Sequence, residues 1–331
     1  MKLRFELKKL YLKETFSIAY GNYDMRDSLL IELSYQNCHG YGECVAIDYY
    51  KIDLGSFVFK LKRFQEEIEA RKIEHPEEFY RFLVLLDLHP FLLSALDCAY
   101  WDIFGKLERK SFIELNNLPS AGLVESSITI SIRDIYKQIE EIETSKWNRF
   151  KVKCKGLNKN DIKKLLALNS HIALDSNASF NNEDCVWLQE EQGVDKFSYL
   201  EQPRPIDHYQ ILKKEGFANW MADEDCQDLD SLDELRPYYK SVNIKLMKCG
   251  GLTPALKMIK KARELNYKIM IGCMTESTVG ISAGCVLTGL VDYTDLDGAN
   301  LISNDYAMGS FVENGKIQLS EKPGLGIELK K

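Results

Sequence analysis

The hydrophobic and polar positions of this chain follow two different periods, one in the first third and another in the rest. Apolar residues first alternate with polar ones, which predicts three antiparallel strands, and then recur at helical spacing. The expected strands are 3–11, 27–35 and 39–45, and the expected helices are 54–72, 76–87 and 91–107. A loop near residues 116–120 ends this part. We therefore expect an α+β domain over residues 1–122.

Strands and helices alternate from residue 126 to residue 303, which predicts parallel β/α units. Seven polar stretches follow short apolar runs at a period of about 25 residues, the length of one strand, one helix and two loops. They are 151–153, 175–177, 201–203, 223–225, 245–248, 272–276 and 295–297. With residues 127–132 as the first strand, these stretches end strands two to eight of a β/α barrel over residues 123–303. We expect the tail, residues 304–331, to pack back on the first domain.

Composition and charge exclude several classes of protein. The 331 residues are 45% hydrophobic and 28% charged, as in a globular protein. The net charge of −7 and the lack of a basic run argue against nucleic acid as a partner. No run approaches the roughly 18 apolar residues of a membrane span, so no membrane partner is expected. Nine cysteines without a C-x-x-C pair, and a start unlike a signal peptide, predict free thiols and a cytoplasmic location.

Lysines end two of the expected barrel strands. Side chains two residues apart share a face of a strand, so Lys151 and Lys153 point the same way. Strands two and six of an eight-stranded barrel lie opposite each other, which sets Lys153 across from Lys245 or Lys248. Two lysines on opposite sides of a substrate suit removal of a proton from one face and its return to the other. A lysine base needs a lowered pKa, which a neighbouring positive charge favours. The alternative is a solvated strand edge.

Carboxylates end the three strands between these lysines, at Asp175, Glu201 and Asp223. Three like charges that converge at a barrel mouth repel one another unless a cation lies among them. Oxygen ligands without histidine or cysteine favour Mg²⁺, with Mn²⁺ as a substitute. The sequence therefore predicts a metal site here, although each residue alone would suit a helix cap or a surface charge.

Two further strand ends carry candidate substrate contacts. Asp295 and Asp297 share a face and look across the barrel from the three carboxylates. A substrate ammonium would suit this pair, and a loop cap around Gly298 is the alternative. Cys273 and Met274 offer backbone groups for hydrogen bonding to a substrate, or sulfur atoms that only pack.

Together these residues resemble the enolase superfamily, in particular its muconate-lactonizing-enzyme subgroup. The finer resemblance is to dipeptide epimerases of the L-Ala-D/L-Glu type, and it extends over the whole chain. The segments 243–251, 272–277 and 295–298 carry it, together with 41–43 and 95–97 in the first domain. It implies a modified TIM (β/α)7β barrel with an α+β capping domain, 1–122 completed by 304–331, over the catalytic domain.

The resemblance also implies a role for each site residue. Asp175, Glu201 and Asp223 would be ligands of one Mg²⁺ per subunit. Lys153 and Lys245 would be the acid/base pair of an isomerase that inverts the α-carbon of the C-terminal residue of a dipeptide through a metal-stabilised enolate. The expected substrate contacts are Thr129, Lys151, Cys273, Met274, Asp295 and Asp297. A loop near residues 16–26 would contact the second side chain; Ala-Glu-selective members carry an arginine there, whereas Arg26 falls outside the matching position.

Other functions remain open at this point. Within the subgroup they are o-succinylbenzoate synthase, muconate cycloisomerase and N-acyl amino acid racemase. The first two substrates lack an ammonium group, so the Asp295 and Asp297 pair argues against them. A non-catalytic binding protein on this scaffold should have lost a lysine or a metal ligand, and none is missing. The sequence does not decide the preferred dipeptide or whether the subunits form a homo-oligomer.

Overall fold

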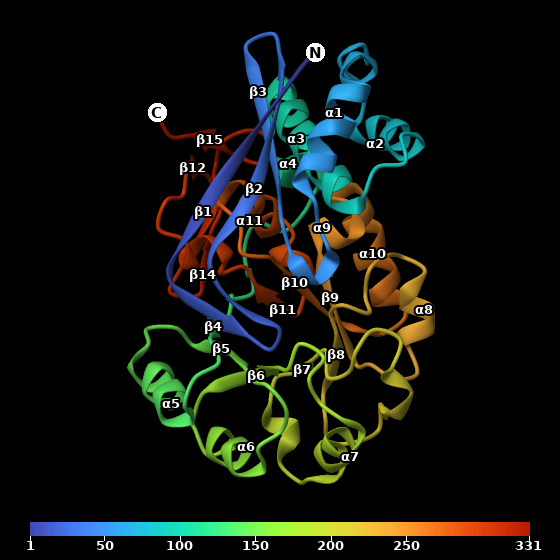
Figure 1. The fold of residues 1–331 in the computed structure, drawn as a ribbon. Coiled ribbons are helices and arrows are strands. Elements are labelled where there is room, and N and C mark those ends of the chain that lie inside the picture. The colour runs from blue at the N-terminus through green and yellow to red at the C-terminus, as the bar shows by residue number, and fades with distance from the viewer.

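The structure is a computed structural model that describes residues 1–331, and Figure 1 shows its two parts. The N-terminal part contains a three-stranded antiparallel sheet in the order β1-β2-β3. Its strands are β1 (Lys2–Ile18), β2 (Gly21–Tyr35) and β3 (Cys38–Val45). All three predicted strands are confirmed, but the β1–β2 hairpin runs on to residues 18 and 21. The register shifts between Tyr11 and Phe16, which interrupts the alternation by which the sequence predicts a strand.

Helices cover one face of this sheet, and the three predicted ones are confirmed. They are α1 (Leu54–Glu69), α2 (Pro76–Leu85) and α3 (Pro90–Glu108), with the short η1 (Asp48–Tyr50) before them and α4 (Phe112–Asn116) after them. Proline stands at the start of α2 and of α3, where its missing N–H costs no hydrogen bond. We call residues 1–116 the cap; the predicted boundary between residues 122 and 123 stays a prediction.

Eight parallel strands form the second part, which confirms the β/α barrel. The strands are β4 (Ile128–Ile130), β5 (Arg149–Lys153), β6 (His171–Asp175), β7 (Leu200–Glu201), β8 (Trp220–Ala222), β9 (Ser241–Lys245), β10 (Lys268–Gly272) and β11 (Tyr293–Asp295). They are hydrogen-bonded in sequence order. A parallel bridge from Ser126 to Thr294 brings the first strand beside the last, so the sheet is nearly closed.

Helices connect most of these strands. They are α5 (Ile135–Thr144), α6 (Lys159–Leu166), α7 (Asn182–Glu190), η2 (Val194–Lys196), α8 (Ser231–Leu235), α9 (Leu246–Cys249), α10 (Leu252–Glu264), α11 (Thr278–Cys285) and η4 (Thr288–Leu290). Only the short η3 (Tyr209–Ile211) follows β7, where Pro203 and Pro205 disfavour a helix. The last strand is followed by η5 (Gly298–Leu301) and no α-helix, in keeping with the (β/α)7β form.

The C-terminal tail packs against the cap. It contains β12 (Ala307–Met308), β13 (Phe311–Glu313), β14 (Lys316–Gln318) and β15 (Glu328–Leu329). The Leu325 amide donates to the Asp102 carboxylate of α3 at 2.8 Å, and Lys106 donates to the Ile327 carbonyl at 2.8 Å. Figure 1 shows the tail, in red, beside the blue β1–β2 hairpin.

Two large hydrophobic cores stabilise the molecule, one inside the cap and one between the barrel sheet and its helices. All nine cysteines are free thiols, as predicted. None of the helices combines the length and the apolar character that a membrane span requires.

Candidate active site

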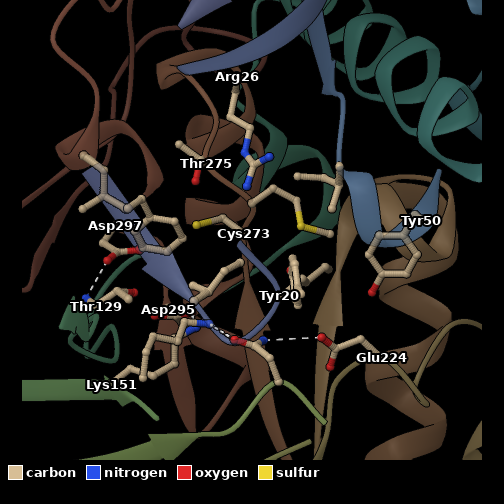
Figure 2. Close-up of a pocket in the computed structure, with 18 residues that line it drawn as sticks. Tyr20, Arg26, Tyr50, Thr129, Lys151, Glu224, Cys273, Thr275, Asp295 and Asp297 are labelled. Carbon is tan, nitrogen blue, oxygen red and sulfur yellow. Dashed lines mark hydrogen bonds and ion pairs between the residues drawn. The ribbon is translucent and has the colours of Figure 1, made fainter. Parts of the chain in front are cut away.

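A pocket lies where the cap meets the mouth of the barrel, and it encloses about 60 Å³ (Figure 2). The cap contributes mostly apolar and aromatic side chains together with one cation: Phe16, Ile18, Tyr20, Arg26, Ile47 and Tyr50. The barrel contributes mostly polar and charged ones: Thr129, Lys151, Lys153, Asn177, Glu224, Lys245, Cys273, Met274, Thr275, Asp295, Asp297 and Leu301. Both predicted catalytic lysines and all six predicted substrate contacts therefore line one pocket.

The lysines of β5 are buried and each pairs with a carboxylate. Lys153 Nζ lies 2.5 Å from Asp175 Oδ2 and 3.2 Å from Asn177 Oδ1. Lys151 donates to Asp295, and its Nζ lies 3.8 Å from Asp175 and 3.7 Å from Glu201. Burial alone would lower the pKa of Lys151, but these carboxylates, Asp295 first, hold it well above its usual value. Lys151 is therefore a fixed positive charge among carboxylates.

The third strand-end lysine, Lys245, shares one carboxylate with Lys248. Lys245 Nζ lies 2.7 Å from Asp223 Oδ2, and Lys248 Nζ lies 2.6 Å from Asp223 Oδ1. Lys245 lines the pocket and Lys248 does not, so the structure selects Lys245 as the lysine opposite Lys153. Burial has the largest single effect on the pKa of Lys245 and lowers it, but Asp223, Glu201 and Glu224 together raise it above its usual value. The same two lysines hold the pKa of Asp223 below its usual value against the effect of burial.

Asp175, Glu201 and Asp223 stand at the ends of β6, β7 and β8; they do not line the pocket, but Asp175 and Asp223 contact the pocket lysines Lys153 and Lys245. All three are almost fully buried, and Asp175 is in direct register with Glu201. Burial and then the Asp175 charge raise the pKa of Glu201 well above its usual value. These carboxylates cost free energy together unless positive charge lies close to them.

The donor set fits a hard divalent cation, although the side chains are turned toward lysines. Oxygen atoms only are offered, which suits Mg²⁺. Glu201 Oε2 is buried and has no hydrogen-bond partner, although Lys151 Nζ lies 3.7 Å from it, so this oxygen could serve as a ligand atom. No group of three histidine, cysteine, aspartate or glutamate side chains is arranged as a ready metal cluster, because Lys153 and Lys245 contact Asp175 and Asp223.

The two aspartates at the end of β11 differ in their partners. Asp295 accepts from Lys151 and, at 2.8 Å, from the Ser127 hydroxyl. Lys151 lowers the pKa of Asp295 against the effect of burial. The Asp297 carboxylate accepts from Thr129, with the amide donating at 2.7 Å, and burial followed by the Asp295 charge raises its pKa to about 6. Figure 2 shows the Asp297–Thr129 bond at the edge of the pocket.

The sequence-based prediction missed or misplaced several pocket residues, of which Arg26, Asn177 and Glu224 carry charge or an amide. Arg26 reaches into the pocket from β2, where only 5% of it is exposed, and its guanidinium stacks 3.7 Å from the centre of the Tyr23 ring. Its Nε has no hydrogen-bond partner. Asn177 and Glu224 lie next to predicted residues: Asn177 accepts from Lys153, and Glu224 Oε2 has no partner. The i, i+2 alternation from Asp175 could have indicated Asn177.

The cap, the barrel and the charged strand ends together are those of the enolase superfamily. Residues 134–331 match the family described as Enolase C-terminal domain-like, and the chain belongs to that family. It is 35% identical to an L-Ala-D/L-amino acid epimerase of Maribacter sp. over 99% of each chain. It is 33% identical to a protein of the same name from Flavobacterium johnsoniae, over 99% of this chain and 100% of that one.

A solved structure agrees with these relatives. The dipeptide epimerase of Enterococcus faecalis, complexed with Mg and L-Leu-L-Tyr, superposes with a TM-score of 0.88 at 25% identity, covering 98% of each chain. Epimerases of this superfamily are isomerases, and this chain is an enzyme of that class.

Proposed function

We propose that this enzyme is a dipeptide epimerase that inverts the α-carbon of the C-terminal residue. Lys153 and Lys245 would exchange the α-proton, one on each face of the substrate. The names of the most similar relatives support this reaction class, and the charges of the pocket support the substrate class.

The position of the two lysines is the observation that carries this proposal. Lys153 ends β5 and Lys245 ends β9, four strands apart in a sheet of eight. Both line the same pocket. A group held between them presents one face to each amine, so either lysine can take the α-proton while the other returns a proton to the opposite face. Inversion then needs no further acid or base.

The two lysines need different protonation states in each direction of the reaction. Lys245 donates to Asp223 Oδ2 at 2.7 Å, which fixes the position of its amine. Asn177 Oδ1 accepts from Lys153 and would orient its amine toward the substrate. Both amines are buried, which limits the access of bulk water to them.

Asp175, Glu201 and Asp223 would hold one Mg²⁺, which Mn²⁺ could replace, and Glu201 Oε2, which has no hydrogen-bond partner, supports this assignment. When bound, the cation would supply positive charge to the substrate carboxylate and favour release of the α-proton. Lys151 would add a second positive charge at the same carboxylate. The enclosed cavity is smaller than the roughly 300 Å³ of common ligand sites, so a dipeptide must displace side chains or the β1–β2 hairpin.

The far end of the pocket would bind the ammonium group of the dipeptide. The Asp297 carboxylate lines the pocket, and no cationic side chain is paired with it, so it is the main candidate. Asp295 would contribute less, because Lys151 already neutralises it. Thr129 positions Asp297 through its amide, while the segment of Cys273 and Met274 forms the adjoining wall.

N-acyl amino acid racemisation is the second candidate, because a single free aspartate provides weaker recognition of an ammonium than the predicted pair. An N-acetyl-D-glutamate racemase of Pseudoalteromonas sp. is 32% identical over 64% of this chain. The same two lysines would serve that reaction. No comparable observation favours o-succinylbenzoate synthesis, muconate cycloisomerisation or a non-catalytic binding role.

Incubation of the enzyme with dipeptide and N-acyl amino acid libraries in D₂O tests the proposal. We expect mass increases of one deuteron in free dipeptides when Mg²⁺ is present and none after EDTA treatment. Restoration by Mg²⁺ or Mn²⁺ should follow. Exchange in N-acyl amino acids alone would replace the first candidate by the second, and full exchange without metal would overturn the metal site.

A further inference from the structure

Glu43 is a buried carboxylate of the cap that contacts the barrel directly. It lies on β3, is 3% exposed and accepts four hydrogen bonds. Oε1 accepts from the hydroxyls of Ser28 at 2.5 Å and Tyr306 at 2.9 Å. Oε2 accepts from the amide of Ser277 at 3.0 Å and from its hydroxyl at 2.6 Å. One side chain therefore joins the cap, the C-terminal tail and the barrel.

The barrel partner, Ser277, fixes the end of a pocket wall. It is the N-cap of α11, and its hydroxyl accepts from the Val279 amide at 3.1 Å. The loop between β10 and Ser277 contributes Cys273, Met274 and Thr275 to the pocket. A carboxylate at the first turn of a helix is stabilised by the unpaired amides there. Because the Glu43 carboxylate is buried, the loss of any of these donors would cost free energy.

Contacts within the loop that follows β10 restrict its conformation. Met274 donates its amide to Glu276 Oε1 at 2.9 Å. A side chain at Gly280 would meet the Glu276 carboxylate, and one at Gly298 would meet the Met274 carbonyl. These contacts hold the loop within the barrel, and Glu43 adds a strong link from it to the cap.

The cap side of this contact is equally fixed. A Cβ at Gly42 would clash with the Ala95 carbonyl of α3, so β3 can lie directly on that helix only with glycine next to Glu43. Ser28, which donates to Glu43, lies two residues after Arg26 on β2. Glu43 thus connects the strand that carries a cap residue of the pocket with the loop that carries three barrel residues.

We propose that Glu43 is a positioning residue of the substrate site, which holds the segment from Cys273 to Thr275 and the β2 strand at the spacing that substrate binding requires. This role rests on the proposed epimerase function, because the site in question is the dipeptide pocket. Glu43 does not line the pocket, so it acts through Ser277 and Ser28. Loss of its carboxylate should weaken substrate binding more than it slows proton transfer at Lys153 and Lys245.

Two variants of Glu43, one control and one substitute variant test this role. Glu43→Met removes all four acceptor interactions at similar volume. Glu43→Gln keeps one oxygen for the Ser277 amide and can donate to the hydroxyls of Ser28 and Tyr306. Asp102→Asn is the matched control, because Asp102 is a buried cap carboxylate that accepts from Tyr41, Lys106 and Leu325, away from the pocket. Ser277→Ala is a milder substitute should Glu43→Met not fold.

Two measurements separate positioning from general stability. Steady-state kinetics should show KM for the dipeptide raised about tenfold in Glu43→Met with kcat changed far less, largely restored in Glu43→Gln and unchanged in Asp102→Asn. Hydrogen exchange of the amides of residues 273–277 should accelerate in Glu43→Met and stay unchanged in Asp102→Asn. Unchanged KM in Glu43→Met, or an equal rise in Asp102→Asn, would overturn the role. Absence of dipeptide turnover by the wild type would instead reject the proposed function, while unchanged exchange would reject the role of Glu43.

Discussion

The cap and the barrel face the same pocket but contribute different kinds of side chain. The barrel contributes lysines and carboxylates from the ends of consecutive parallel strands, held by sheet register. The cap contributes apolar and aromatic groups and Arg26 from a hairpin and the η1 segment. In the proposed mechanism the barrel would provide the groups for proton transfer, and the cap would provide a surface that selects the side chain and excludes water. Substitutions in the two regions should affect different kinetic parameters.

The largest effect is expected from the barrel lysines. Lys153→Ala and Lys245→Ala should each reduce epimerisation by at least ~10²-fold, the usual contribution of a positioned acid or base. Chiral chromatography of the dipeptide product measures this. Lys240→Ala is the control, because Lys240 precedes β9 and donates to the Gly216 carbonyl outside the pocket. Comparable loss in Lys240→Ala would mean that the effect reflects folding.

A smaller effect is expected at Asp297. Loss of its charge in Asp297→Asn should lower kcat/KM for free dipeptides by about 10²-fold, the cost of a buried charge-assisted contact. Calorimetric titration with Mg²⁺ should give an affinity close to that of the wild type. Efficient turnover of N-acetyl dipeptides by the wild type would contradict ammonium recognition by this residue.

Arg26 tests the contribution of the cap. Arg26→Met should change the choice among side chains rather than the proton transfer itself, because the guanidinium lies on the cap wall. We expect the kcat/KM ratio of L-Ala-L-Glu to L-Ala-L-Gln to fall by about tenfold in this variant. Arg133→Met, which removes an exposed ion pair with Glu141, is the control. An unchanged ratio would restrict Arg26 to packing on Tyr23.

The smallest effect concerns stability at the junction of the two regions. Burial and then the Glu43 charge raise the pKa of Glu276 to about 8, from 4.5 when free. The folded state thus binds this proton more tightly than the unfolded state, so the free energy of unfolding should fall as pH rises between these values. Glu276→Gln, which stays neutral, should make the urea-unfolding free energy less dependent on pH over this range. An equally steep fall in that variant would exclude Glu276 as the cause.

The difference between the barrel and the cap also explains which features could be predicted from the sequence. A regular period of strands and the two-residue alternation within each strand are local signals, and they placed Lys153, Lys245 and Asp297 in one pocket. Because neighbouring strands are in register, residues that are distant in the sequence then lie close together at one end of the barrel. The β/α barrel follows from the same signals, apart from the missing helix after β7, whereas its (β/α)7β form was implied by the family resemblance.

Features that depend on long-range side-chain contacts could not be predicted in this way. Arg26 reaches the pocket because the β1–β2 hairpin extends past an irregular register, which no periodic pattern indicates. Glu43 is a single charge in a strand, and its four donors come from three distant segments. The pairing of Asp175 and Asp223 with lysines likewise depends on side-chain conformation rather than on strand spacing.

The most direct test of two lysines on opposite faces is stereospecific exchange of the α-proton in D₂O. Each diastereomer of the dipeptide, differing only at the second residue, is incubated separately with Lys153→Ala and with Lys245→Ala and followed by NMR. We predict that each variant exchanges the α-proton of one diastereomer only, and that the two variants differ in which one. Equal exchange of both diastereomers by either variant would contradict the account.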